Sequence, residues 1–168
     1  MVAAGILRED EPVELIDGRL IAMPPQGSVH RTLTVVLRRL LESAYGDAVL
    51  VQSHSPIDAG PVSMPEPDLA VVRGDPRALL DRHPAGRDTV LAVEIAYSSQ
   101  AIDRAKASVY ARAEVPVYWL LDVPARRLSV YAEPRSGEYA LTRVIADDET
   151  APLPELADRT LAVADMLP

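Results

Sequence analysis

Apolar and polar residues in the first part of the chain alternate in a way that predicts a hairpin followed by a long helix. The segment 13–23, VELIDGRLIAM, consists of two apolar strands joined by Asp17-Gly18, a pair typical of two-residue β-hairpin turns. After the break PPQGS, apolar residues recur at helical spacing over 29–45. Ser28 is available as the cap of this helix.

The middle of the chain predicts a buried sheet that is crossed by a second helix. Four apolar segments read as strands, at 48–58, 68–73, 89–96 and 115–123. The near-continuous apolar run of 89–96 is typical of a central strand that is buried on both faces. A helix from Gln100 or Ala101 to Ala113 joins the last two strands. This strand–helix–strand order predicts that the two strands are parallel.

The C-terminal third predicts a second hairpin. RLSVYAE and EYALTRVI form its strands and PRSG its turn, whereas the proline-rich tail 151–168 predicts only one weak strand or helical turn. The segment 74–88 is expected to be a loop with one helical turn. The whole order predicts a single α/β domain over residues 1–168, built around a mixed sheet.

Composition narrows the class of protein. The chain has 168 residues, 48% of them hydrophobic, and no cysteine, so disulfides, thiolate metal sites and cysteine nucleophiles are excluded. It has no apolar run of membrane-spanning length, and its N-terminus turns acidic too early for a secretory signal. We therefore expect a cytoplasmic globular protein that has no membrane partner.

The charge of the chain bears on its partners. The net charge of −8 argues against a broad nucleic-acid-binding surface, although a local arginine-lined groove or a divalent metal would still allow contact with nucleic acid. Of the 17 basic residues only Lys106 is a lysine. A lone lysine indicates a position where a compact ammonium that can lose its proton is preferred over a guanidinium, with chance as the alternative.

Two acidic residues stand on neighbouring predicted strands. Asp68 starts one strand directly after a proline, and Glu94 lies in the middle of the apolar strand that follows. Strand alternation places Glu94 on one face with Ala92 and Ala96, which leave room around its carboxylate. A charge in such a run needs either a functional role or a buried partner.

The following helix brings further polar side chains to one face. Asp103, Lys106 and Tyr110 are spaced i, i+3 and i+7. Two carboxylates on strands and a lysine on the adjoining helix make a workable site for a hard divalent cation such as Mg²⁺, with the ammonium orienting or deprotonating a water. The alternative is a structural salt bridge between Glu94 and Lys106 without any metal.

An ordered series of motifs over residues 10–135 resembles the PD-(D/E)XK nuclease superfamily. The closer resemblance is to the large bacterial family of restriction-endonuclease-like proteins of the Uma-two type. It is carried by ELIDGRL, by His30 at the start of the first helix, and by PEPDLAVV, VEIAYSS and DRAKASVYARAEVPVYWLLD. The resemblance implies a restriction-endonuclease-like core with an N-terminal hairpin, a helix, a central mixed sheet with a helical crossover and a C-terminal hairpin.

The resemblance also implies a set of site residues. Asp68 and Glu94 would be metal ligands for Mg²⁺ or Mn²⁺, together with the Ile95 carbonyl, and Glu14 matches an acid that would complete the shell. The superfamily lysine would fall at Ala96, so its role would pass to the lysine of the following helix.

Four further positions are possible auxiliaries. His30 and Gln52 match positions near the site, Tyr110 follows the lysine by one helical turn, and Asp103 starts the helix and offsets the lysine charge. The expected substrate is DNA and the expected assembly is a homodimer, because many nucleases of this superfamily pair to cut two strands.

Two functions follow from these patterns. The first is a metal-dependent endonuclease that hydrolyses phosphodiester bonds of DNA. The second is a catalytically inactive nuclease-like domain that serves binding or dimerisation, an interpretation favoured by the acidic composition and by Ala96. The sequence has no glycine-rich phosphate loop, no HExxH and no G-x-S-x-G that would direct the assignment elsewhere.

Overall fold

A six-stranded mixed sheet forms the centre of the molecule. The computed structural model describes residues 8, 11–23, 25–97 and 100–168, with the backbone alone for residues 100–104. The strands lie in the order β3-β4-β5-β6-β7-β8, and only the β5–β6 pair is parallel. Their bounds are β3 Val49–Ser53, β4 Leu69–Arg73, β5 Thr89–Ala96, β6 Val117–Asp122, β7 Arg127–Arg135 and β8 Glu138–Ala146. The predicted α/β class and the parallel crossover are confirmed.

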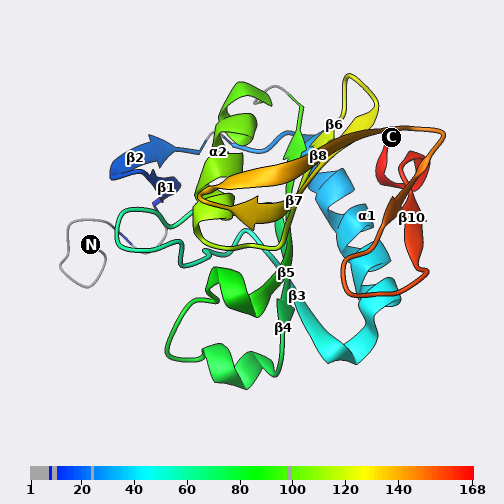
Figure 1. The fold of residues 1–168 in the computed structure, drawn as a ribbon. Coiled ribbons are helices and arrows are strands. Elements are labelled where there is room, and N and C mark those ends of the chain that lie inside the picture. Colours follow the sequence, from blue (N-terminus) through cyan, green and yellow to red (C-terminus); the bar gives the residue numbers. More distant parts are fainter. Residues whose placement is uncertain (1–7, 9–10, 24, 98–99) are drawn as a thin grey trace.

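Two helices cover the two faces of this sheet. Helix α1 (Ser28–Tyr45) packs against β3, β4 and β5, whereas α2 (Gln100–Arg112) packs against β5 to β8. Figure 1 shows the two helices on opposite sides of the sheet. Every residue of β5 is buried, because this strand is covered by a helix on each face and flanked by a strand on each edge.

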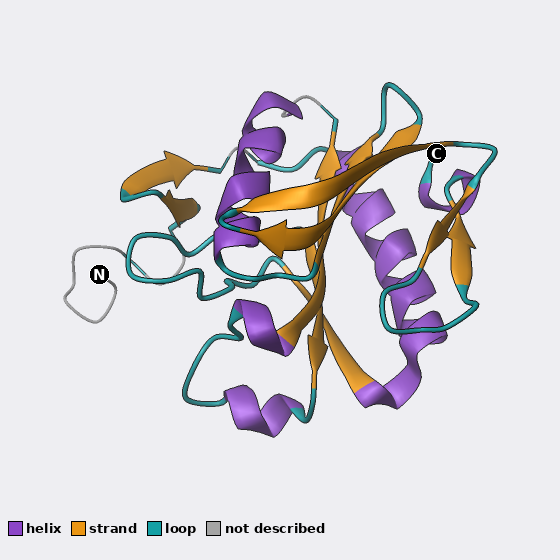
Figure 2. Cartoon of the chain, viewed as in Figure 1, coloured by secondary structure: helices purple, strands orange, loops and turns teal. Residues whose placement is uncertain are grey.

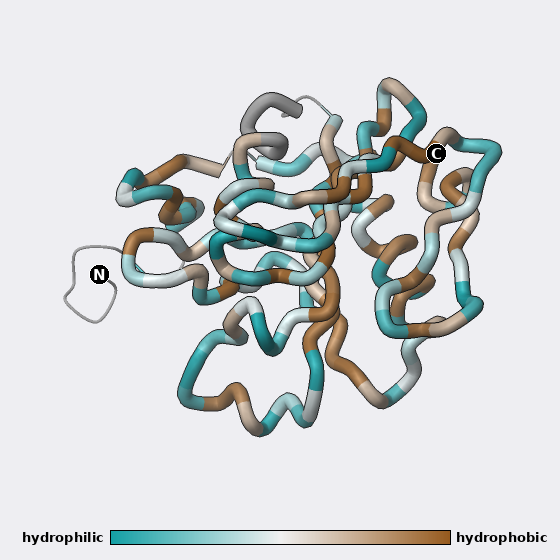
Figure 3. The backbone as a smooth tube through the Cα atoms, in the orientation of Figure 1, coloured by the Kyte–Doolittle hydropathy of each residue, from teal (hydrophilic) through white to brown (hydrophobic). Residues whose placement is uncertain are grey.

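Alternation along β5 separates two hydrophobic clusters. Leu91, Val93 and Ile95 belong to the core under α1, whereas Ala92 and Ala96 belong to the core under α2. The brown segments at the centre of Figure 3 are the hydrophobic residues of these central strands. The predicted division of faces is therefore correct, and it places Glu94 on the α2 side.

Shorter elements surround the central layers (Figure 2). β1 (Val13–Ile16) and β2 (Arg19–Ala22) form the predicted N-terminal hairpin, and positive φ angles at Asp17 (47°) and Gly18 (75°) match the favoured two-residue turn. The remaining elements are β9 Thr150–Pro152, β10 Thr160–Ala162 and four 3₁₀ turns at Gly46–Ala48, Pro76–Leu79, Gly86–Asp88 and Ala164–Met166.

Three local predictions differ from the structure. The strand expected over 48–58 ends at Ser53, because its partner β4 begins at Leu69 and leaves no backbone for the residues beyond to pair with in the sheet. The cap of α1 is Gly27, in extended conformation, and Ser28 is already helical, so its side chain does not cap the helix. The C-terminal tail holds two paired strands and a 3₁₀ turn instead of one weak element.

Among the described residues, no helix combines the length and the apolar character needed to cross a membrane. Cytoplasmic location and a single domain over residues 1–168 stay predictions.

Gly86 holds one close packing contact in this fold. A Cβ at this position would lie 1.7 Å from the backbone oxygen of Ala113, at the end of α2. We expect Gly86→Ala to lower the free energy of unfolding by about 1–3 kcal/mol or more, because backbone has to shift. Urea unfolding measures the loss. Gly27→Ala is the control for a Cβ that meets nothing within 4 Å, and it should lose only the preference for glycine over alanine at the cap of α1, about 1 kcal/mol. A loss at Gly86 no larger than the loss at Gly27 would contradict this packing.

Candidate active site

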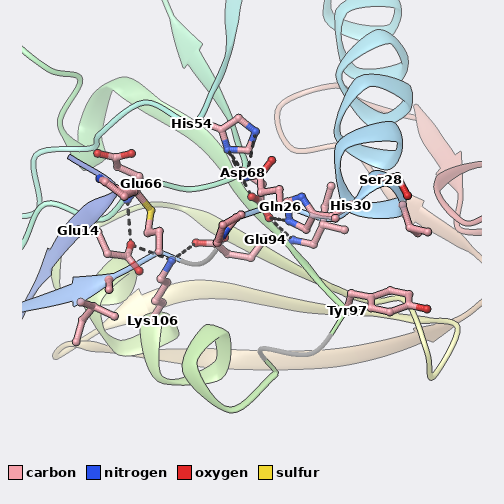
Figure 4. Close-up of a pocket in the computed structure, with 18 residues that line it drawn as sticks. Glu14, Gln26, Ser28, His30, His54, Glu66, Asp68, Glu94, Tyr97 and Lys106 are labelled. Atoms are coloured by element: carbon pink, nitrogen blue, oxygen red, sulfur yellow. Dashed lines mark hydrogen bonds and ion pairs between the residues drawn. The ribbon is translucent and has the colours of Figure 1, made fainter. Parts of the chain in front are cut away.

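A pocket of about 810 Å³ brings together residues from distant parts of the chain. Its walls come from the β1–β2 hairpin, the segment before α1 with the first turn of α1, the approach to β4, the end of β5 and one residue of α2. Figure 4 shows how the polar side chains converge on it. The titratable residues in the lining are Glu14, His30, His54, Glu66, Asp68, Glu94, Tyr97 and Lys106.

The ammonium of Lys106 lies between two carboxylates. Its Nζ is 2.9 Å from Glu94 Oε1 and 2.9 Å from Glu14 Oε2, and the three side chains are only 4–7% exposed. Tyr110, one turn further along α2, also donates its hydroxyl to Glu94 Oε1, at 2.9 Å. The predicted helix face thus reaches Glu94 from α2, and the predicted salt bridge between Glu94 and Lys106 is present.

Burial and the neighbouring carboxylates determine the protonation states of Lys106 and Tyr110. Burial by itself lowers the pKa of Lys106, but the carboxylates of Glu94 and Glu14 outweigh it, and the pKa of Lys106 is raised. Burial raises the pKa of Tyr110, and the neighbouring Glu94 carboxylate raises it further. In this arrangement Lys106 is an ammonium and Tyr110 a neutral hydroxyl donor.

A second cluster surrounds Asp68, at the start of β4. The backbone N–H of Ile95 donates to Asp68 Oδ2 at 2.7 Å, and His30 Nε2 lies 3.0 Å from the same oxygen. His54 Nδ1 lies 3.6 Å from Asp68 Oδ1 and 3.1 Å from the Gln26 amide nitrogen. Two histidines and a backbone amide therefore hold this carboxylate in the pocket.

The register of the sheet places Asp68 and Glu94 side by side. Leu69 pairs with Val93 across the antiparallel β4–β5 ladder, so extending this register by one residue places Asp68, directly before β4, opposite Glu94. The N–H of Ile95 points toward Asp68, and in an extended strand the C=O of a residue points to the same edge as its N–H. The Ile95 carbonyl is thus directed toward the Asp68 side of the pocket.

The donor set of this pocket fits a hard divalent cation by its chemistry. Carboxylate and carbonyl oxygens from Asp68, Glu94, Ile95 and Glu14 are the ligands that Mg²⁺ and Mn²⁺ prefer. Within the part of the chain that the structure describes, no three His, Asp or Glu side chains are gathered in the arrangement of a preformed metal centre. The oxygens are instead held by Lys106, Tyr110, His30 and a backbone amide.

The structure does not bring every predicted residue into the pocket. Gln52 pairs with Ala70 in the sheet, its amide donates to Ser55 O at 3.5 Å, and it is not part of the described pocket lining. The side chain of Asp103 lies outside the described residues, so its auxiliary role stays a prediction.

Three pocket residues were missed by sequence reasoning. His54 and Gln26 contact one another beside Asp68, and Glu66 lines the pocket with its N–H 3.3 Å from Glu14 Oε2. Burial lowers the pKa of His54, which Asp68 partly offsets. Burial and then the Glu14 charge raise the pKa of Glu66. The PEPD motif already held Glu66 two residues before Asp68, and this closeness in sequence to a candidate ligand was the available signal.

Comparison with known proteins identifies the family and the fold of this chain. The model of the Uma2 family, described as "Putative restriction endonuclease", matches residues 4–164. The chain belongs to this family. A crystal structure from Anabaena variabilis, described as a putative nuclease belonging to DUF820, superposes with a TM-score of 0.80 at 18% identity, over 95% of this chain and 92% of that one. No curated protein matches significantly.

These matches confirm the restriction-endonuclease-like fold and the family resemblance seen in the sequence. The description of the Uma2 family suggests a nuclease, whereas the match to the solved structure supports the fold.

Proposed function

We propose that this Uma2 protein is a metal-dependent endonuclease that hydrolyses phosphodiester bonds of DNA. The observation that carries the proposal is the pocket itself. Asp68, Glu94, Glu14 and Lys106 come from four separate segments of the chain and line one cavity. Buried charges of both signs that converge in a pocket are typical of functional sites.

Asp68, Glu94 and the Ile95 carbonyl are the proposed holders of Mg²⁺ or Mn²⁺, and Glu14 is the proposed fourth donor. When bound there, the cation would neutralise charge on the scissile phosphate and polarise its P–O bonds. The contacts of His30 to Asp68 and of Lys106 to Glu94 each use one carboxylate oxygen, so a bound cation would either replace these contacts or share the carboxylates with them.

Lys106 is the proposed stabiliser of the reacting groups. An ammonium has three N–H donors, and Glu14 and Glu94 take two of them. The third is the donor that would orient the attacking water or hydrogen-bond to a phosphate oxygen as negative charge develops. Tyr110 is a positioning residue, since its hydroxyl holds Glu94.

One observation favours a second function, an inactive nuclease-like domain that serves binding or dimerisation. The charge of Lys106 is already balanced by two carboxylates, an arrangement that is complete as a buried ion-pair network without a metal. The homodimer expected from the sequence belongs to either function and stays a prediction.

Plasmid nicking separates the two functions. Purified protein is incubated with supercoiled DNA and Mg²⁺ or Mn²⁺, and with an excess of chelator as the control. An endonuclease converts supercoiled DNA to open circles only when the metal is free. The inactive domain leaves both the plasmid and a single-stranded circular DNA uncut under every condition.

Metal binding is also expected to stabilise the fold. A ligand that binds only the native state adds about 2.7 kcal/mol when present at about 100 times its Kd, and for a chain of this size each kcal/mol raises the melting temperature by about 2–4 °C. Thermal unfolding with Mg²⁺ or Mn²⁺ should show such a rise for the wild type and none for Asp68→Asn. Glu138→Gln, which removes an exposed carboxylate on β8, should keep it. If the melting temperature of the wild type does not change when the metal is added, the proposed metal site is contradicted.

A further inference from the structure

One wall of the pocket is apolar and aromatic. Ile21, Met23 and Val29 line it together with Tyr97, the residue directly after β5. Tyr97 is 54% exposed and Val29 38% exposed. Figure 4 shows Tyr97 on the side of the pocket away from Glu14 and Lys106, with Asp68 and Glu94 between them. An aromatic face is thus accessible next to the groups proposed to act on a phosphodiester.

The proposed reacting groups are recessed. The side chains of Glu14, Glu94, Lys106 and Asp68 are only 4%, 5%, 7% and 10% exposed. A DNA duplex is a stiff rod with a persistence length of about 50 nm, and bending or opening it to enter a recess costs free energy. A single strand has unpaired bases and a flexible backbone, so it can follow the floor of a pocket.

The charge of the lining also disfavours a duplex. The pocket is lined by the four carboxylates of Glu14, Glu66, Asp68 and Glu94, and Lys106 is the only lysine or arginine among its described lining residues. Duplex binding depends mainly on cations that contact both phosphate backbones. Where cations are scarce, stacking of bases on aromatic rings supplies affinity, and it requires bases that are unpaired.

We propose that the pocket takes an unpaired nucleotide of a single-stranded DNA segment, with a base stacked on Tyr97 and the adjoining phosphate at Asp68 and Glu94. This inference rests on the proposed nuclease function and adds the substrate class. Tyr97 is then a specificity-determining residue, because its ring face favours single-stranded over double-stranded DNA.

Fluorescence anisotropy tests this assignment. The probe is a fluorescein-labelled oligonucleotide, either single-stranded or annealed to its complement. The buffer contains Ca²⁺, a divalent cation that prefers oxygen ligands. We expect the wild type to bind the single strand more tightly. We expect Tyr97→Ala to weaken single-strand binding by about 5- to 150-fold, the range for losing one stacked base, and to leave duplex binding unchanged. Tyr97→Phe keeps the ring and should bind as the wild type does.

The matched control is Val144→Ala, which removes a side chain of similar exposure (55%) on β8, outside the pocket. Preference for the duplex, no binding of either probe, or equal single-strand affinity of wild type and Tyr97→Ala would overturn the inference. Cleavage reports on the proposed function separately. If the protein cuts duplex plasmid at a rate that does not depend on Tyr97, the nuclease function stands and the single-strand preference fails. If the protein binds the single strand through Tyr97 but cleaves no DNA, the single-strand preference stands and the nuclease function fails.

Discussion

Lys106→Met is expected to lower the free energy of unfolding by about 3–5 kcal/mol, because it leaves the buried carboxylates of Glu14 and Glu94 without their cation. Methionine retains most of the length of the lysine side chain, so the loss reports on charge more than on packing. If the protein is an endonuclease, the same change removes the donor to the reacting phosphate, and cleavage should fall by about 100-fold or more. Urea unfolding measures the first effect and plasmid nicking the second.

Arg38→Met is the matched control for stability. It removes a cation from an exposed i,i+4 pair with Glu42, in which both side chains are nearly half exposed, and such pairs contribute about 0.3–0.5 kcal/mol. A loss at Lys106 no larger than the loss at Arg38 would contradict the buried network.

Glu94→Gln is expected to reduce DNA cleavage by about 100-fold or more while the protein still folds. The amide oxygen can still accept hydrogen bonds from Lys106 and Tyr110, and Glu14 still balances the ammonium, so the local structure is retained. A neutral amide is, however, a much weaker ligand for a hard divalent cation than a carboxylate. The initial rate of plasmid nicking, at equal melting temperature, checks this effect.

The control for this variant is Glu42→Gln, which removes an exposed carboxylate on α1. It should cleave at the wild-type rate. Full activity of Glu94→Gln would show that cleavage does not depend on this carboxylate and would remove the central member of the proposed site.

The parts of the fold that follow from local periodicity were predictable from the sequence. Alternation along β5 placed Glu94 on the face with Ala92 and Ala96, and helical spacing put Lys106 and Tyr110 on one face. The strand–helix–strand order predicted the parallel β5–β6 pair.

Contacts that depend on long-range register were not predictable. His54 reaches Asp68 only because Ser53 pairs with Leu69, and no local pattern sets that alignment. Gln26 lies at the site because the segment before α1 folds over the pocket. The sequence around Gln26 indicates only an interruption between the hairpin and the helix. The two strands of the tail pair with each other across residues 153–159, and their weak local propensity predicted only one weak strand or helical turn.

The choice between a metal site and an ion pair also lies beyond the sequence. Both interpretations use Glu94 and Lys106, and they differ in distances that spacing does not fix. The 2.9 Å contacts show that the ion pair is present, and the proposed function requires the same two carboxylates to bind a cation as well.

The most direct test is the rate of Mn²⁺-dependent nicking of supercoiled plasmid by the wild type and by Asp68→Asn, purified in the same way. Asparagine still accepts the hydrogen bond from the Ile95 N–H, so the change removes the negative charge with little effect on the fold. The endonuclease proposal predicts metal-dependent nicking by the wild type and at least about 100-fold less by Asp68→Asn. Equal rates for the two proteins, or no cleavage by either of this plasmid and of single-stranded circular DNA, would contradict it.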